Sequence, residues 1–213
     1  FVESVDVTQR KGSPVNEDAR TGDTAWMALA LFKNVQRNAD KTLAKAIATS
    51  RDSKAASNFE STGRLADLKA TLQDKTGGIV TAAKSQELIA KLKPAQQERL
   101  NRANEAMRYL QSLKGSDGGF RRGPEGQHED AKIISTEENA TVAAAAQHAY
   151  ELTQDGTFFD SYADSVRWLG TSGAFDRSGG FFTRGMANGA LDARYSTEAN
   201  TTPLLALGPE VLD

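Results

Sequence analysis

Three stretches of the chain place a short polar segment before a run of apolar or small residues, a pattern typical of helices buried nearly all round. The first has polar residues at 21–24 and eight consecutive apolar residues at 25–32. The other two begin with a seven-residue motif that occurs twice, at 135–141 and at 196–202. We therefore predict three inner helices, each introduced by polar capping residues.

The seven-residue motif belongs to a longer internal repeat. It reads Ser-Thr-Glu-Glu-Asn-Ala-Thr at 135–141 and Ser-Thr-Glu-Ala-Asn-Thr-Thr at 196–202, with five of seven positions identical. A Gly-Gly-Phe precedes each copy, at 118–120 and 179–181, and both motifs recur at an offset of 61 residues. Because two motifs share one offset, we read them as one repeat: outer helix, Gly-Gly-Phe turn, loop, cap and inner helix.

The amphipathic segments 103–113 and 162–169 are the outer helices of the two repeats. The composition of 39–113 is rich in Ala, Lys, Gln, Glu and Leu, and its periodicity predicts four helices, at 39–50, 59–74, 81–92 and 95–113. The first two inner helices are much further apart than one repeat. We therefore interpret 39–102 as a helical insertion within a single domain that spans 1–213.

The predicted fold class is all-α. The alternation of β-branched residues typical of a substantial sheet is absent, although the Gly-Gly-Phe segments can pair as short strands. Inner and outer helices in alternation form an open solenoid or a closed ring. Four consecutive small side chains at Ala143–Ala146 allow inner helices to approach one axis closely, which favours a toroid-like ring of helical hairpins.

The order outer helix, Gly-Gly-Phe, loop, Ser-Thr-Glu-x-Asn and alanine-rich helix resembles the six-hairpin (α/α) toroids of bacterial glycoside hydrolases and their relatives. The segment at 21–31 is similar to inner-helix starts in that family, and the resemblance covers 21–36 and 103–213. It implies a periplasmic or secreted protein that processes a polysaccharide or oligosaccharide. Because such a ring needs more repeats than are visible here, we expect a fragment, or an incomplete ring that a second protein chain completes.

Two glutamates, Glu137 and Glu198, recur at the third position of both copies of the motif. Helix dipoles stabilise acidic groups at such positions by about 0.3–1 kcal/mol, so an ordinary helix-start role explains them as well as a functional one does. In a ring all caps face the same end, so these side chains should converge on one mouth. Glycoside hydrolysis needs an acid and a second carboxylate, and the candidates are Glu137, Glu198 and Asp117, the last being equally suited to a turn.

Candidates for substrate binding are the two motif asparagines, one aromatic ring and one arginine: Asn139, Asn200, Trp26 and Arg121. By the resemblance, aromatic rings stack on sugar faces, with Phe120 and Phe181 as further candidates; all three rings are also suited to the core. Arg121 belongs to a set of loop arginines suited to an anionic sugar or carboxylate, or to solvated surface charge: Arg121, Arg122 and Arg184.

Composition and charge exclude several other classes. The net charge of −2 over 213 residues gives no general attraction to nucleic acid or to an anionic membrane. No apolar run approaches the roughly 20 residues of a membrane helix. The chain lacks cysteine, and neither His128 nor His148 lies at a metal-ligand spacing, so we expect no metal and no cofactor. Since the chain starts at Phe1, we also expect a processed or excised segment.

Three functions stay open on these grounds. The first is a glycoside hydrolase-like enzyme, favoured by a cleft that holds two carboxylates. The second is a non-catalytic toroid-like module that binds glycan or a protein partner, with the insertion 39–102 as its partner-facing part. The third is an isoprenoid-type toroid, suggested by Gln111-x5-Asp117-Gly-Gly-Phe, but the 7% aromatic content suits its aromatic-lined cavity poorly.

Overall fold

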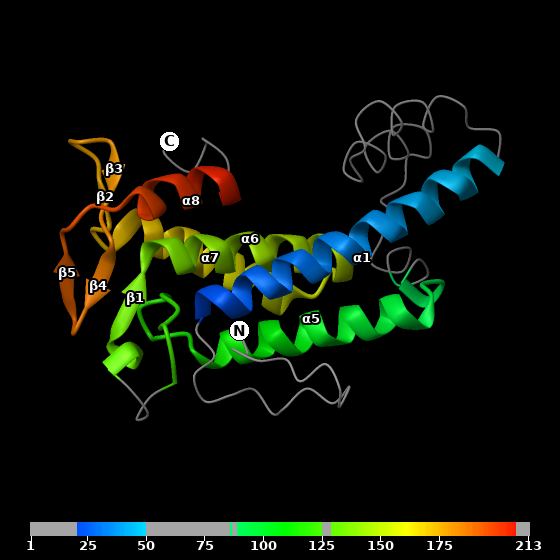
Figure 1. Cartoon of the computed structure of the whole chain (residues 1–213), viewed down its shortest axis with the longest axis horizontal. Helices are drawn as coiled ribbons and strands as arrows, with labels where there is room; N and C mark the ends of the chain where they lie inside the picture. The colour runs from blue at the N-terminus through cyan, green and yellow to red at the C-terminus, as the bar shows by residue number, and fades with distance from the viewer. Residues whose placement is uncertain (1–20, 50–85, 87–88, 125–128, 208–213) are drawn as a thin grey trace.

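The computed structural model describes the backbone of residues 21–49, 86, 89–124 and 129–207, and their side chains except at 39–49 and 129–130. This part of the chain contains five α-helices (Figure 1): α1 (Thr21–Thr49), α5 (Pro94–Ser112), α6 (Thr136–Thr153), α7 (Gly156–Thr171) and α8 (Thr197–Leu207). The predicted helix at 59–74 and most of the one at 81–92 lie outside the described residues. None of the described helices has the length and apolarity needed to span a membrane.

The helices form two packed layers. Helix α6 lies between α1 and α8, and these three are the predicted inner helices. The outer helix α5 packs on α1, and the outer helix α7 packs on α6. The predicted starts of α6 and α8 are confirmed, because each begins at the threonine of its polar cap, Thr136 and Thr197. Helix α1 is described from Thr21 onwards and includes the polar segment 21–24 that was predicted to precede it.

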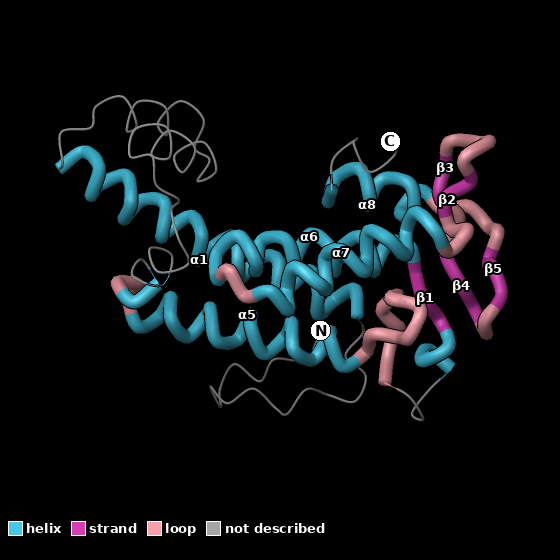
Figure 2. Tube along the Cα trace, turned by 180° about the vertical axis from the view of Figure 1, so that it is seen from behind, coloured by secondary structure: helices cyan, strands magenta, loops and turns pink. Residues whose placement is uncertain are grey.

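The prediction of an all-α toroid is wrong, because two small antiparallel sheets gather at the ends where α6 and α8 begin (Figure 2). One sheet has the order β1-β4-β5 and the other is the β2–β3 hairpin. Their strands are β1 (Ile133–Ser135), β2 (Phe175–Asp176), β3 (Phe181–Phe182), β4 (Gly185–Ala187) and β5 (Ala190–Asp192). Strands of two or three residues are too short to show an alternating pattern in the sequence. The protein is therefore a mixed α and β fold, and the described helices are an open stack.

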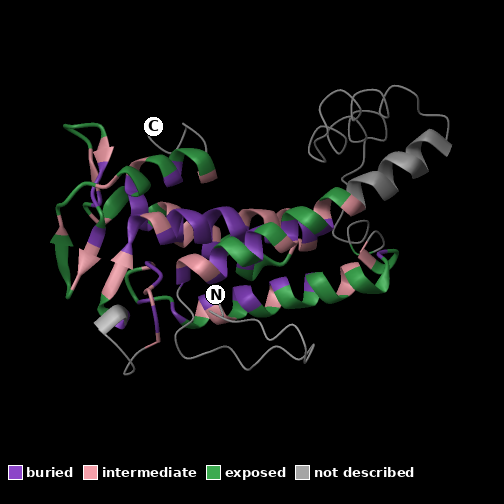
Figure 3. Ribbon diagram, viewed as in Figure 1, coloured by how far each residue is buried: buried purple, intermediate pink, exposed green. Residues whose placement is uncertain are grey.

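The burial of the inner helices differs from the prediction in one of them. Helix α6 is buried along most of its length, as expected from its alanines (Figure 3). Helix α1 was expected to be buried nearly all round, but Trp26 and Met27 are each 44% exposed. Helix α1 has one inner neighbour among the described elements, whereas α6 has two. No described element therefore covers one side of α1.

Helix α1 also runs further than predicted. The sequence between 25 and 49 contains neither glycine nor proline, so nothing ends the helix at the expected boundary near 39. At the other side of the predicted insertion, α5 begins at Pro94, close to the predicted start. The described parts of 39–102 thus continue α1 and lead into α5, which pack together as one hairpin.

Candidate functional site

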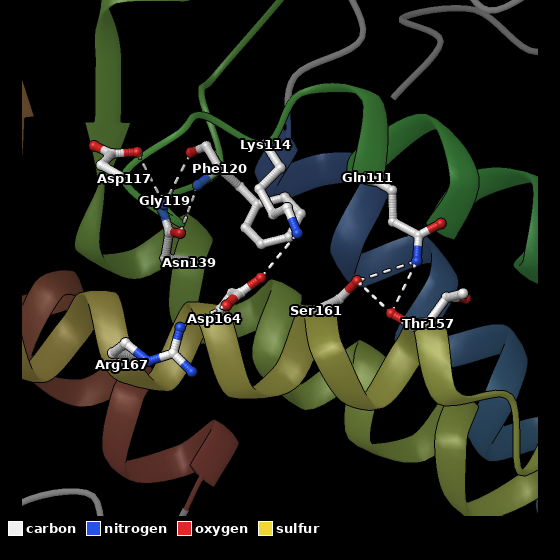
Figure 4. Close-up of polar contacts among 10 residues, drawn as sticks. All are labelled: Gln111, Lys114, Asp117, Gly119, Phe120, Asn139, Thr157, Ser161, Asp164 and Arg167. Atoms are coloured by element: carbon white, nitrogen blue, oxygen red, sulfur yellow. Dashed lines mark hydrogen bonds and ion pairs between the residues drawn. The ribbon is translucent and has the colours of Figure 1, made fainter.

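A buried asparagine ties the first Gly-Gly-Phe turn to the start of α6. The side-chain oxygen of Asn139 accepts a hydrogen bond from the backbone N–H of Phe120 at 2.8 Å. Its amide nitrogen donates to the carbonyl oxygen of Phe120 at 3.1 Å (Figure 4). The same nitrogen donates to the carbonyl oxygen of Ser135 at 2.9 Å. Asn139 and Phe120 are both fully buried. The asparagine therefore replaces a neighbouring strand as the hydrogen-bonding partner of the Phe120 backbone.

The second repeat makes the same three bonds with a shift of one residue. Asn200 accepts from the N–H of Phe182 at 2.8 Å and donates to the carbonyls of Phe182 at 2.9 Å and Ser196 at 3.0 Å. The shared offset of 61 residues predicts that Phe181 is equivalent to Phe120. The hydrogen bonds show instead that the equivalent residue is Phe182. Phe181 instead packs edge-on against Tyr195, with 4.5 Å between ring centroids.

Helices α1 and α6 each also hold the loop that leads to the next inner helix. The N–H of Thr136 donates to the carbonyl of Arg184 at 3.1 Å, and its hydroxyl donates to Thr183 O at 2.8 Å. Thr21 does the same one repeat earlier: its N–H donates to Arg122 O at 3.0 Å and its hydroxyl to Arg121 O. These bonds bring Arg122 and Arg184 to the end of the stack where the inner helices begin.

A cleft of about 280 Å³ lies at this end, between the starts of α6 and α8 and the strands of the three-stranded sheet. Its walls carry three arginines, three carboxylates and several small or apolar residues. The lining residues are Arg122, Ile133, Ser135, Glu137, Arg184, Met186, Ala187, Asp192, Arg194, Ser196, Glu198 and Ala199. The cleft is therefore a polar site between the two copies of the motif.

Glu137 and Glu198 both line this cleft, as the prediction that the caps converge on one mouth requires. The pKa of Glu137 is raised, first by partial burial, then by the nearby charge of Glu198, and also by Asp23. The cation of Arg122 acts in the opposite direction on the same pKa. Glu137 is thus a carboxyl group that retains its proton to higher pH than an ordinary glutamate does.

Behind this pair, Glu138 is buried and bound to Arg122, with 3.1 Å between the Glu138 Oε1 and Arg122 Nε atoms. The N–H of Glu138 donates to the Ser135 hydroxyl at 3.4 Å, which is the predicted cap of α6. Gly22 leaves the space for this side chain, because a Cβ atom there would lie 2.9 Å from Glu138 Cγ. The buried carboxylate of Glu138 therefore fixes the position of Arg122 in the wall of the cleft.

On the opposite wall, Asp192 and Arg194 form a two-point ion pair that the sequence analysis missed. Arg194 Nε and one terminal nitrogen donate to the two Asp192 oxygens, each at 2.7 Å. Hydrogen bonds from Arg194 lower the pKa of Asp192 to about 2, and the charge of Arg184 also lowers it. Asp192 lies in β5, and nothing in the repeat pattern marks that strand, so no signal in the sequence could have identified it.

The other predicted carboxylate, Asp117, does not line the cleft. It lies in the turn after α5, where its side-chain oxygen accepts the N–H of Gly119 at 3.1 Å, an ordinary turn contact. Figure 4 shows it on the far side of the Phe120 turn from α7. Asp176 has the equivalent role in the second repeat, accepting from the backbone of Ser178 and Gly179.

The four predicted binding residues are likewise not among those that line the cleft. Asn139 and Asn200 use both amide atoms on the backbone, so their role is to position the turns. Trp26 is on the exposed side of α1. Arg121 lies in the turn after α5, where its backbone N–H donates to the Leu113 carbonyl at 3.0 Å. Arg122, Arg184 and Arg194 are the arginines that line the cleft.

The cleft offers acid and base groups but few metal ligands. Within the described residues, no three His, Asp or Glu side chains come together as a metal site, and His128 lies outside these residues. His148 is on α6, where its Nδ1 is 3.0 Å from Gln36 Oε1 of α1, and burial lowers its pKa. No protein-family model, curated protein or solved structure matches this chain.

Proposed function

We propose that the protein is a glycoside hydrolase-like enzyme that acts on a polysaccharide or oligosaccharide in the cleft between α6 and α8. The observation that carries this proposal is that Glu137 and Glu198, at equivalent positions of two repeats, line one cleft and interact electrostatically. Hydrolysis of a glycosidic bond uses a pair of carboxyl groups on either side of the bond.

Glu137 is the proposed proton donor. A general acid must keep its proton near the working pH, and the pKa of Glu137 is raised by burial and by Glu198. Glu198 is more exposed and is the proposed base or nucleophile, because water or a sugar carbon can reach it. As Glu137 loses its proton to the leaving oxygen, Arg122 stabilises the new negative charge.

The arginines supply the binding contacts in this proposal. The guanidinium groups of Arg184 and Arg194 are exposed on the wall of the cleft and can donate several hydrogen bonds to sugar hydroxyl or carboxylate groups. Since Arg194 is fixed on Asp192, its remaining donors have a defined direction. Ile133 and Met186 add apolar surface for the face of a sugar ring.

The test is release of reducing ends from a panel of neutral and acidic polysaccharides, with the parent protein beside Glu137→Gln and Glu198→Gln. Removal of a general acid or its partner lowers turnover by about 10²–10⁴-fold. Glu105→Gln, on the exposed surface of α5, is the matched control and should retain full activity. Glu137→Gln and Glu198→Gln must still bind the glycan that the parent hydrolyses, as measured by calorimetry.

Two results would redirect the proposal. If the parent binds glycan without turnover and Glu137→Gln weakens the binding, the protein is the non-catalytic glycan-binding module of the alternative. If turnover and binding are unchanged in both variants, the cleft is not the functional site.

A further inference from the structure

The three inner helices can be compared position by position because they begin with equivalent threonines. Thr21 and Thr136 make the same pair of bonds to the loop that leads to the next inner helix. Thr197 is the first residue of α8 and has the same place in the motif as Thr136. Counting from these threonines therefore gives equivalent positions in α1, α6 and α8.

One set of equivalent positions changes from buried to exposed at α8. In α1 and in α6 these positions are fully or nearly fully buried: Ala25, Ala28 and Leu29, and Ala140, Ala143 and Ala144. In α8 they are Thr201, Leu204 and Leu205, which we name the α8 face. All three are exposed, Leu204 at 40% and Leu205 at 83%. The side that α1 and α6 cover with later helices thus has no covering element on α8 among the described residues.

A second set changes in the opposite sense. In α6 and α8 these positions are buried or partly buried: Thr141, Val142 and Ala145, and Thr202, Pro203 and Ala206. In α1 they are Trp26, Met27 and Ala30, which we name the α1 face. All three are exposed, Trp26 and Met27 at 44% each. The side that α6 and α8 place against an earlier inner helix therefore has no neighbour on α1 within the part of the chain that the structure describes.

The two faces are complementary because α6 uses both. Helix α6 is packed between α1 and α8, so its two sides are the buried equivalents of the α8 face and the α1 face. Contact between an α8 face and an α1 face would reproduce the inner-helix contact that occurs twice within the chain, between α1 and α6 and between α6 and α8. It would continue an existing interface by one further helix.

We propose that the α8 face of one copy of this chain binds the α1 face of a second copy. The contact would cover Leu205, the most exposed large apolar residue described, with the ring of Trp26 and the side chain of Met27. Because the two faces differ, the contact is head-to-tail. The assembly therefore keeps an unused α1 face at one end and an unused α8 face at the other. This inference does not depend on the proposed enzymatic activity.

Head-to-tail contact makes a prediction that a symmetric dimer does not. Leu205→Glu removes the α8 face and leaves the α1 face intact, whereas Met27→Glu does the reverse. Burying an unpaired carboxylate in an apolar contact should weaken it by more than about 100-fold, so each variant alone should be a monomer. An equal mixture has one intact pair of faces and should form a dimer of one copy of each variant, with nothing larger.

The experiment is sedimentation velocity of the full 213-residue chain over a range of concentrations. The parent should sediment faster as its concentration rises. Leu191→Glu is the control, since Leu191 is 45% exposed on β5, and it should associate as the parent does. Far-UV circular dichroism checks that every variant is folded.

Three outcomes would overturn the proposal. A parent that stays monomeric at all concentrations would mean that the two faces serve a different partner. Dimers of Met27→Glu alone would indicate a symmetric contact between two α8 faces. A mixture of folded variants that remains monomeric would show that the α1 and α8 faces do not bind each other.

Discussion

Replacing Asn139 with alanine removes the side chain that connects the Phe120 turn to the start of α6. The amide makes three hydrogen bonds of 2.8–3.1 Å, to the N–H and carbonyl of Phe120 and to the carbonyl of Ser135. Alanine can make none of them. Since Asn139 and Phe120 are both fully buried, water cannot easily replace the amide.

The expected loss of stability follows from the groups left without partners. Asn139→Ala leaves one backbone N–H and one carbonyl of Phe120 unsatisfied in the interior, and each such group costs about 1–3 kcal/mol. The total is about 2–6 kcal/mol, a large part of the 5–15 kcal/mol that is typical for the stability of a domain. Asn200 makes the same bonds in the second repeat but is only half-buried. Phe182 is itself buried, but water can approach from the partly exposed Asn200 position, so Asn200→Ala should cost about 1 kcal/mol.

Urea unfolding followed by far-UV circular dichroism measures both variants, with free energies from linear extrapolation. The comparison is internally matched, because the same substitution removes the same three bonds at two levels of burial. Asn139→Ala should lose at least about 1 kcal/mol more than Asn200→Ala. Equal losses would refute the assignment of Asn139 as the buried connection between the turn and the helix.

Four further variants test the cleft and the three-stranded sheet beside it. Gly185→Ala should destabilise the fold by about 3 kcal/mol or more in the urea assay, because φ is +117° and a Cβ atom would lie 2.2 Å from the Ile134 carbonyl oxygen. Gly189→Ala is the comparison: φ is +75° but the space around it is open, so the cost should be about 1–2 kcal/mol. Arg122→Gln removes the cation that lowers the pKa of Glu137, so the fall in turnover with rising pH should move to higher pH, and a shift to lower pH would contradict the proton-donor role. Asp192→Asn should change the unfolding free energy by less than about 1 kcal/mol, since its arginine partner is exposed, and a larger loss by the urea assay would mean that the pair stabilises the sheet.

The sequence predicted the starts of two inner helices because their signals are local. Polar caps followed by apolar runs located the starts of α6 and α8, and the alanines of 143–146 correctly indicated a helix packed on several sides. Helix α7 begins at Gly156, six residues before the predicted outer helix at 162–169. The repeat also predicted that Glu137 and Glu198 share one rim. The three-stranded sheet was missed because pairing of β1 with β4 joins segments about 50 residues apart, and strands of three residues carry no pattern of their own. The short pairing expected for the Gly-Gly-Phe segments does occur, since Phe181 lies in β3 and Phe120 forms a bridge with Lys114.

The errors in the predicted site have a common cause. Recurrence in both copies was taken as a sign of function for Asn139 and Asn200, but both side chains hydrogen-bond the turn of their own repeat. A residue that positions the turn recurs for the same reason as a residue that binds substrate. The contribution of β5 to the cleft, Asp192, lies outside the repeated motifs and was invisible for that reason.

Differences between the repeats distinguish the junction of α6 with α8, which holds the cleft, from the junction of α1 with α6. Counting from the first threonine of each helix, Glu137 and Glu198 correspond to Gly22 in α1. The first junction therefore has one glutamate of this pair, and the absence of a side chain at Gly22 admits the buried Glu138. Glu138 fixes Arg122 near Glu137, and the charge of Arg122 lowers the pKa of Glu137, the proposed acid. The start of α1 thus supports the chemistry proposed for the starts of α6 and α8, so replacing Gly22 should disturb the cleft without changing any residue that lines it.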